Sequence, residues 1–166
     1  MKAIILAAGN GIRMRPLTKV LPKPLLAIGR QTLLDHLVSK FPKEIDELVL
    51  VVRHLGQKMK NYCGKEFYGR PVRYIDQPAN ENGTFAALKP CRPLLKPGEQ
   101  FFVFYADDLM AAKAIKQCLK HPRAIVASEV AEPEKFGVLQ LNADGTLAAI
   151  IEKPKRPQPH LVLTNT

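Results

Sequence analysis

A glycine-rich turn followed by a basic residue stands near the start of the chain. Gly9 and Gly11 come after the apolar run of residues 2–7, and Arg13 follows two positions later. Backbone N–H groups at glycine can approach a phosphate chain closely, because no side chain stands in the way. The turn is neither a Walker loop nor a dinucleotide fingerprint, since no Gly-Lys-Ser/Thr follows and Met14 occupies the third glycine position. We therefore expect arginine side chains to neutralise a phosphate chain bound here.

The distribution of charge supports an anionic ligand at this end of the chain. Residues 1–30 contain six basic residues and no acidic residue, which is more than half of the net charge of +10. Such a concentration of one sign predicts attraction of an anion. A nucleic-acid partner is the other explanation of a basic protein, but single-strand binders stack bases on aromatic side chains. Residues 1–30 contain no Phe, Tyr or Trp, so we expect no nucleic-acid binding.

A second basic motif lies close to the first. Lys23 stands between Pro22 and Pro24, and Leu25 follows. The two prolines fix the backbone on both sides of the lysine, so its ammonium group is presented from a stiff segment. The alternative is an exposed loop lysine without a ligand, which the motif by itself leaves open.

Taken together, residues 6–18 and residues 22–25 resemble the sugar-phosphate nucleotidyltransferases, also called nucleotide-sugar pyrophosphorylases. Further matches follow in the family's order: Gln77 with Gly83-Thr84, Asp107 after an apolar strand, Phe136-Gly137-Val138, Glu152-Lys153-Pro154 and Asn165-Thr166. The resemblance thus extends over the whole chain. It implies a Rossmann-like nucleotidyltransferase core.

The resemblance also implies a role for each matching residue. Nucleotide binding would fall to Leu6, Ala7, Ala8, Gly9, Gly11, Gln77, Gly83 and Thr84. The catalytic residues would be Arg13, which grips the β- and γ-phosphates, and Lys23, which lies near the α-phosphate. Asp107 would hold Mg²⁺, the implied cofactor. The sugar-1-phosphate side would be lined by Gly137, Glu152, Lys153 and Asn165.

The implied reaction transfers a nucleotidyl group from a nucleoside triphosphate to a sugar-1-phosphate, giving an NDP-sugar and pyrophosphate. A phosphate oxygen is the nucleophile and needs no general base, so positioning and charge neutralisation carry the catalysis. Asp107 follows an apolar strand, where an open α/β sheet binds ligands, and we expect its neighbour Asp108 to point elsewhere. Mg²⁺ keeps several waters, so one or two carboxylates suffice.

The sequence departs from the family in three places. Ala106 stands where similar enzymes usually have Gly, and Ile12 stands where many have a hydroxyl side chain. Family members also continue beyond the final Asn-Thr to a second metal-binding Asp, and no residue here takes that role. We therefore expect residues 1–166 to form a nucleotidyltransferase core domain truncated at its C-terminus. A catalytically inactive nucleotide- or sugar-phosphate-binding module is the alternative, and the base and the sugar stay open.

These residues need a scaffold of alternating strands and helices. Strands are expected at residues 2–7, 48–52, 72–76, 101–106, 123–130, 138–141 and 146–152. Helices are expected at residues 32–40, 55–62, 84–88 and 111–119, and residues 9–24 form a loop. The Asp144-Gly145 turn predicts a C-terminal β-hairpin. The fold class is therefore α/β, with a mostly parallel sheet and helices on both faces.

The remaining composition excludes several classes of protein. Three widely spaced cysteines without a CxxC pair predict neither a disulfide framework nor a zinc site. No apolar run reaches the roughly 20 residues that a membrane span needs. We expect a soluble, cytoplasmic protein with no membrane partner, in which self-association is possible. His36 and His54 are expected on the surface of a helix and a loop.

Overall fold

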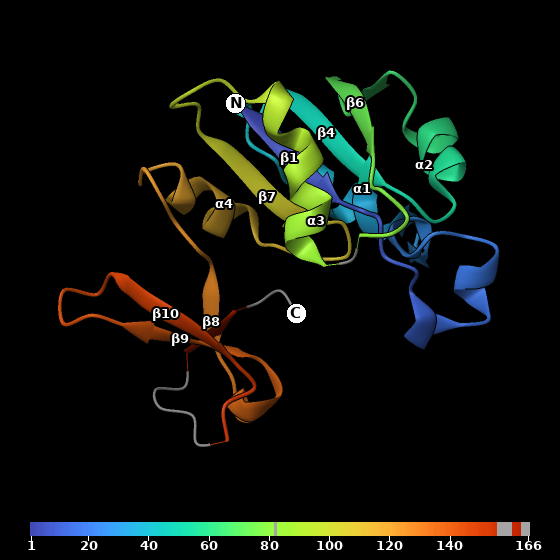
Figure 1. Ribbon diagram of the computed structural model, residues 1–166. Helices are drawn as coiled ribbons and strands as arrows, with labels where there is room; N and C mark the ends of the chain where they lie inside the picture. Colours follow the sequence, from blue (N-terminus) through green and yellow to red (C-terminus); the bar gives the residue numbers. More distant parts are fainter. Residues whose placement is uncertain (82, 156–160, 164–166) are drawn as a thin grey trace. The chain divides into compact units, whose positions relative to one another are not determined.

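The computed structural model describes residues 1–81, 83–155 and 161–163. The chain divides into two compact units, residues 1–115 and residues 116–166. Each unit contains its own main sheet (Figure 1). The expected parallel sheet lies in the first unit, and the expected C-terminal hairpin lies in the second.

A five-stranded sheet forms the centre of the first unit. Its strands are β1 (Lys2–Leu6), β4 (Glu47–Val52), β5 (Glu66–Phe67), β6 (Arg70–Asp76) and β7 (Phe101–Tyr105). Their order is β5-β6-β4-β1-β7, and every neighbouring pair except β5–β6 is parallel. The apolar runs of β1 and β4 are buried, as strands covered on both faces must be. The predicted α/β class is confirmed.

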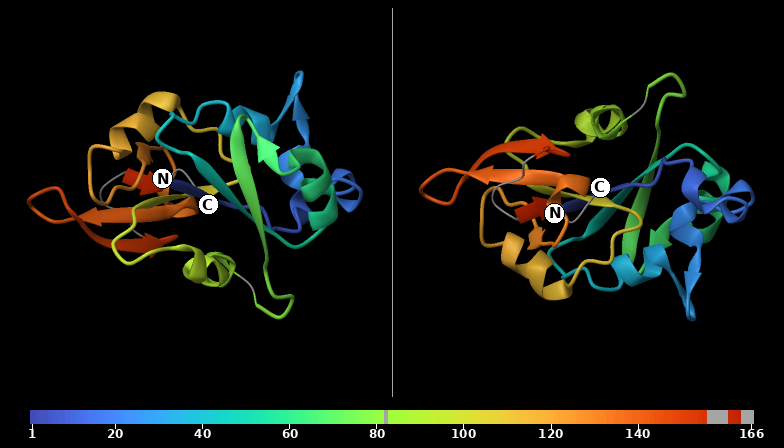
Figure 2. Two further views of the ribbon diagram at one scale, coloured as in Figure 1. Left: turned by 90° about the horizontal axis from the view of Figure 1, so that it is seen from above. Right: turned by 90° about the horizontal axis from the view of Figure 1, so that it is seen from below.

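Short helices connect these strands and cover the sheet. The helices are α1 (Leu33–Val38), α2 (Gly56–Cys63), α3 (Thr84–Leu88) and α4 (Ala112–Cys118). Seen along the sheet, α3 lies on one side and α1 on the other (Figure 2). On the α3 side, Ala87 and Cys91 pack against Ile4, Leu6 and Val49. This packing holds the start of α3 against β1, where the pocket described below begins.

The predicted loop after β1 contains three short 3₁₀ turns instead of extended chain. These turns are η1 (Ile12–Met14), η2 (Leu17–Lys19) and η3 (Lys23–Leu25). A small hairpin that the sequence pattern does not predict follows, formed by β2 (Ala27–Ile28) and β3 (Gln31–Thr32). Later in the chain, the helix at α3 continues past its predicted end as η4 (Lys89–Leu94), which accommodates two prolines. The tighter 3₁₀ geometry allows these compact segments to turn within a few residues.

The cap of α1 is the best-defined polar contact of the scaffold. The Thr32 hydroxyl accepts a hydrogen bond from the Asp35 N–H at 3.1 Å, and the Asp35 carboxylate accepts one from the Thr32 N–H at 2.8 Å. This capping box confirms the predicted role of Thr32. The Tyr62 hydroxyl also donates to Asp35, at 2.6 Å, and so links α2 to α1. Burial raises the pKa of Asp35, but the hydrogen bonds from Tyr62 and Thr32 outweigh it and leave the pKa below its ordinary value.

The second unit contains an antiparallel sheet. Its strands are β8 (Ala127–Glu129), β9 (Gly137–Leu141), β10 (Leu147–Glu152) and β11 (Leu161–Leu163), in the order β10-β9-β11-β8. A further 3₁₀ turn, η5 (Pro133–Lys135), precedes β9. The β9–β10 pair confirms the predicted hairpin. β8 is shorter than the predicted strand over residues 123–130 and pairs with β11 over Ala127–Glu129.

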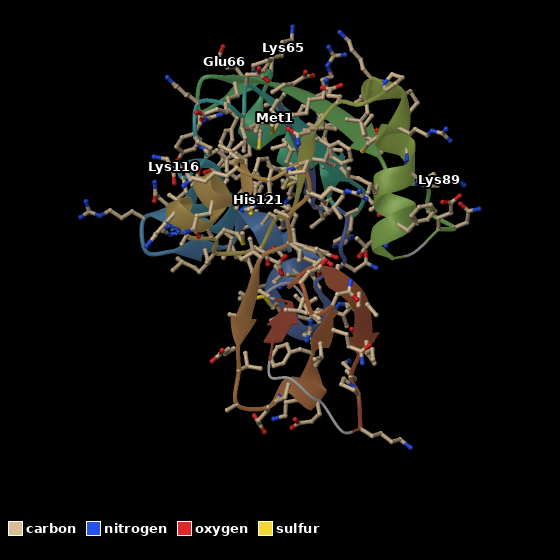
Figure 3. The ribbon with its side chains drawn as sticks, turned by 90° about the vertical axis from the view of Figure 1, so that its left-hand side faces the viewer. Met1, Lys65, Glu66, Lys89, Lys116 and His121 are labelled. Atoms are coloured by element: carbon tan, nitrogen blue, oxygen red, sulfur yellow. The ribbon has the colours of Figure 1, made fainter. Side chains whose placement is uncertain are left out.

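Charged side chains mark the outer edge of the first sheet. Lys65 and Glu66 are exposed and project away from the body of the unit at β5 (Figure 3). Charges at an edge strand discourage pairing with another sheet. Within the described ranges, no helix combines the length and hydropathy needed to cross a membrane.

The three cysteines are free thiols, as the sequence predicts. Cys63 and Cys91 are buried, whereas Cys118 is partly accessible. Burial raises the pKa of Cys63 to about 12 and that of Cys91 to about 11. Both thiols therefore act as small apolar side chains in the core.

Candidate functional site

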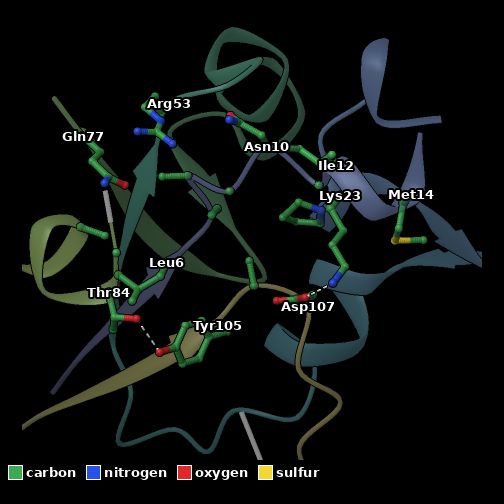
Figure 4. A pocket seen from close by; sticks show the side chains of 18 of the residues that line it. Leu6, Asn10, Ile12, Met14, Lys23, Arg53, Gln77, Thr84, Tyr105 and Asp107 are labelled. Carbon is green, nitrogen blue, oxygen red and sulfur yellow. Dashed lines mark hydrogen bonds and ion pairs between the residues drawn. The ribbon is translucent and has the colours of Figure 1, made fainter. Parts of the chain in front are cut away.

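A cleft of about 720 Å³ opens at the carboxyl ends of β1, β4, β6 and β7 (Figure 4). Leu6 at the end of β1 pairs with Val51 on one side and Tyr105 on the other, so the strands end at one level. In the sheet, β4 lies on one side of β1 and β7, which comes later in the chain, lies on its other side. Open α/β sheets bind ligands at such a reversal of strand order.

The cleft gathers all the residues that the sequence assigned to the nucleotide, to catalysis and to metal. They are Leu6, Ala7, Ala8, Gly9, Gly11, Arg13, Lys23, Gln77, Gly83, Thr84 and Asp107. These residues come from segments up to about a hundred positions apart, and the strand ends bring them together. The cleft has the size of a ligand-binding site.

At one position of the glycine turn, Gly11, the backbone conformation and the surrounding atoms admit only glycine. Gly11 has a φ of +59°, in the left-handed region. A Cβ at Gly11 would lie 2.8 Å from Cγ2 of Thr18, which is closer than real Cβ contacts allow. The Thr18 hydroxyl donates to the Gly11 carbonyl at 2.7 Å, and Thr18 is 1% exposed. The turn is thus closed by a buried side chain that leaves no room for another residue at Gly11.

At the other end of the cleft, the amide of Gln77 has a fixed orientation. Its Nε2 donates to the Glu81 carbonyl at 2.8 Å, and Nη1 of Arg53 donates to the same carbonyl at 3.1 Å. A carbonyl oxygen only accepts, so Nε2 of Gln77 must face Glu81. Nearby, the hydroxyls of Thr84 and Tyr105 are hydrogen-bonded at 2.8 Å (Figure 4). This end therefore presents the Gln77 amide, two hydroxyl groups and the guanidinium group of Arg53.

An ion pair between Lys23 and Asp107 marks the charged end of the cleft (Figure 4). About a third of each of the two side chains is exposed, so both are accessible from the cleft. Lys23 is positioned by η3, whose turn is closed by the Leu26 N–H donating to the Lys23 carbonyl at 3.0 Å. Asp107 lies in the turn directly after β7, and the Ala106 N–H donates to the Leu6 carbonyl at 3.1 Å. The pair therefore joins η3 to the end of β7.

Asp108 does not line the cleft with its neighbour. The Asp108 N–H donates to the Tyr105 carbonyl at 3.1 Å, so the chain turns directly after β7. Oδ2 of Asp108 is buried and has no hydrogen-bond partner among the described residues. Burial raises the pKa of Asp108 to about 6, and the nearby charge of Asp107 adds to the rise.

A magnesium ion fits the donor set at Asp107. The carboxylate of Asp107 faces the cleft and supplies the hard oxygen that Mg²⁺ prefers. No cluster of three or more potential metal ligands occurs within the described ranges. Mg²⁺ that binds together with a nucleotide usually takes phosphate oxygens and water as its other ligands.

The residues predicted for the sugar phosphate lie in the second unit. Gly137 at the start of β9 pairs with Glu152 at the end of β10, and Lys153 follows. The Lys153 N–H donates to the Phe136 carbonyl at 2.9 Å, and Nζ of Lys153 lies 3.8 Å from Glu152. One end of the hairpin thus brings three of the four residues together. The fourth, Asn165, lies outside the described residues.

Several residues of the cleft were not assigned by sequence reasoning. They are Asn10, Ile12, Met14, Pro24, Arg53, Ala87, Tyr105 and Ala106. Arg53 and Tyr105 are the important omissions, because they add a cation and a hydroxyl to the cleft. A usable signal existed for Arg53, since it is the first polar residue after the buried strand β4. Ile12 and Ala106, which depart from the family pattern, also line the cleft.

Comparison with known proteins agrees with this arrangement. The family model described as nucleotidyl transferase matches residues 2–165, which is nearly the whole chain. The chain belongs to the nucleotidyl transferase family. Its mixed, mostly parallel sheet with the glycine turn after β1 is thus the scaffold of a known family.

Individual members of the nucleotidyl transferase family are similar over the same region. The bifunctional protein GlmU of Methanocaldococcus jannaschii is 30% identical over 98% of this chain. The catalytic subunit beta of mannose-1-phosphate guanylyltransferase from Dictyostelium discoideum is 32% identical over 93% of it. The chain spans only 38% and 45% of the length of these two relatives.

A solved structure shows the same fold. It is a Bacillus anthracis protein assigned as a glucose-1-phosphate thymidylyltransferase and crystallised with sucrose. The TM-score is 0.84 at 27% identity, over 99% of this chain and 69% of the other. The Rossmann-like nucleotidyltransferase fold expected from the resemblance is confirmed.

Proposed function

We propose that this nucleotidyl transferase family member transfers a nucleotidyl group from a nucleoside triphosphate to a sugar-1-phosphate, forming an NDP-sugar and pyrophosphate. One observation carries the proposal: a glycine turn, three cations and a carboxylate line one cleft at the ends of the central strands. The family membership and the names of the relatives, which include a mannose-1-phosphate guanylyltransferase, support it.

The triphosphate binds along the glycine turn. The backbone of residues 6–11 lies along the cleft beside Arg13. In the proposed complex, Arg13 contacts the β- and γ-phosphates and stabilises the pyrophosphate as it leaves. The planar guanidinium group suits two phosphate oxygens at once. The base lies toward Gln77, Gly83 and Thr84.

The chemical step is a displacement at the α-phosphorus. An oxygen of the sugar-1-phosphate forms the new bond to this phosphorus, and the bond to the β-phosphate oxygen breaks. The phosphate nucleophile brings no proton that must be removed, so the protein acts by positioning and by neutralising charge. Lys23 lies in η3 and forms an ion pair with Asp107. In the proposed complex it contacts the α-phosphate. When bound at Asp107, Mg²⁺ supplies positive charge at the phosphates.

The sugar-1-phosphate is assigned to the hairpin end of the second unit. Gly137, Glu152 and Lys153 gather there, and Asn165 is included on the family pattern alone. Lys153 contributes a cation for the phosphate and Glu152 a carboxylate for sugar hydroxyls. A screen of nucleoside triphosphates and sugar-1-phosphates determines which base and which sugar the protein uses.

A pyrophosphate-release screen tests the proposal. Four nucleoside triphosphates are each combined with several sugar-1-phosphates and Mg²⁺, and the wild-type chain is compared with Arg13→Ala and Arg15→Ala. Arg15 is the matched control, because it lies in the same loop but does not line the cleft. At least one substrate pair should release pyrophosphate only when both substrates are present, and only Arg13→Ala should abolish this release. Saturable nucleotide binding without turnover for any pair would instead favour a binding module.

A further inference from the structure

The loop that carries the glycine turn has little anchoring of its own. Within residues 9–20, Thr18 is the single buried residue, and all others are partly or fully exposed. The side chain of Thr18 holds the Gly11 carbonyl, as described above. The position of the whole loop therefore depends on what holds Thr18.

The turn between β4 and α2, together with the first turn of α2, supplies that anchor. Nε2 of His54 lies 3.1 Å from the Thr18 carbonyl, and Nζ of Lys58 donates to the Val20 carbonyl at 2.6 Å. A carbonyl oxygen only accepts, so Nε2 of His54 carries the hydrogen of this bond. His54 is half-buried and does not line the cleft. His54 thus lies in the turn after β4, as expected, and makes a backbone contact that sequence reasoning did not assign.

The residue before His54 holds the opposite wall of the cleft. Arg53 donates to the carbonyl of Glu81, in the segment that carries Gln77 and Gly83. Arg53 and His54 are consecutive, and each contacts a different wall of the cleft: Arg53 the segment of Glu81, and His54 the glycine loop. Leu55, the next residue, has a φ of 54°, a conformation that is costly for a branched side chain. Such strain persists where the surrounding contacts enforce it, and it concentrates at functional segments.

We propose that His54 is a positioning residue for nucleotide binding, which acts by holding the glycine loop through the Thr18 carbonyl. This inference rests on the proposed function, because the loop is the wall along which the triphosphate binds. Nucleotide binds only to the held loop, so the apparent dissociation constant rises as the held fraction falls. Loss of one neutral hydrogen bond then shifts the opening equilibrium of the loop by about 2- to 10-fold and raises the apparent dissociation constant by at most that factor.

Two substitutions separate positioning from a general structural role. His54→Leu removes the donor, whereas His54→Gln keeps an N–H group at a similar distance from the backbone. Gln57→Leu is the control, because Gln57 lies in the neighbouring helix and its side-chain hydrogen bond, to Asn61 at 2.8 Å, does not involve the loop. Hydrogen exchange of the loop amides is measured without nucleotide, and nucleotide affinity is measured in parallel.

The expected result is selective. In His54→Leu, exchange in residues 11–20 should accelerate by about 2- to 10-fold, and nucleotide affinity should weaken by at most the same factor. His54→Gln and Gln57→Leu should behave like wild type in both measurements. Unchanged exchange and affinity in His54→Leu would overturn the proposal, and so would faster exchange spread evenly over β1 and β4. If the wild-type chain binds no nucleotide at all, the proposed function fails, and loop exchange alone then decides whether His54 holds the loop.

Discussion

Replacing Gly11 with alanine should disturb the glycine loop in a way that can be worked from the structure. The left-handed conformation at Gly11 costs a residue with a Cβ roughly 1–2 kcal/mol. The new methyl group would also lie 2.8 Å from Cγ2 and 3.1 Å from Cβ of Thr18. Thr18 cannot move away without exposing its buried side chain and breaking the bond to the Gly11 carbonyl. Overpacking of this kind costs about 1–3 kcal/mol.

The two costs add because they have different origins. Together they predict a loss of at least about 2 kcal/mol in the free energy of unfolding. For a chain of this size, such a loss lowers Tm by at least about 4 °C. Gly9→Ala is the matched control: Gly9 does not have a positive φ, and a Cβ there meets no atom within 4 Å.

Thermal unfolding and nucleotide titration of both variants form the assay. Gly11→Ala should unfold at lower temperature and bind nucleotide weakly. Gly9→Ala should unfold like wild type but bind nucleotide less well, because Gly9 lines the cleft and the methyl group takes space there. The reasoning is refuted if Gly11→Ala keeps both the wild-type Tm and the wild-type affinity.

Three further substitutions test separate parts of the site and scaffold. Arg13→Ala should lower turnover by about 100- to 1000-fold without unfolding the chain, and Arg13→Lys should also be poor; near-normal steady-state rates would remove Arg13 from the site. Asp107→Asn should reduce the Mg²⁺ dependence of nucleotide binding more than Asp108→Asn does, as measured by calorimetry. A larger reduction in Asp108→Asn would assign the metal to Asp108 instead. The pKa of Asp35 lies below its ordinary value, so its stabilisation is present above the unfolded pKa and is lost as the pH falls through the folded pKa. Tyr62→Phe should therefore lower the free energy of unfolding by about 1 kcal/mol at pH 7 and by less at a pH below about 4. Denaturant titration at both pH values measures this difference. An equal loss at both would contradict the stabilising role of the Tyr62–Asp35 hydrogen bond.

The parallel core was predictable because its signals are local. The buried runs at β1 and β4 are continuous apolar segments, and Thr32 is a capping residue directly before a helical pattern. The second sheet was less accessible to sequence reasoning. β11 inserts between β9 and β8, so the limits of β8 depend on a partner more than thirty residues away.

The site was predictable where residue types carry a local meaning. The glycine turn at Gly11 and the lysine between two prolines belong to the motifs whose combined resemblance to a family predicted a nucleotide-binding loop. The contributions of Arg53 and His54 depend on which backbone carbonyls the fold brings within reach. Arg53 contacts the carbonyl of Glu81, 28 positions away along the chain, and His54 contacts that of Thr18, 36 positions away. Spacing in the sequence carries no information about such contacts.

The central claim is that the cleft beside the glycine turn binds a nucleoside triphosphate. The most direct test is a titration of the isotope-labelled chain with each of four nucleoside triphosphates and Mg²⁺, followed by backbone amide NMR. At least one nucleotide should produce saturable shifts that are largest at Gly9, Gly11 and Gly83, and Arg13→Ala should weaken them. The account is contradicted if the folded chain shows no saturable shifts with any nucleotide, or if the shifts lie away from the residues that line the cleft.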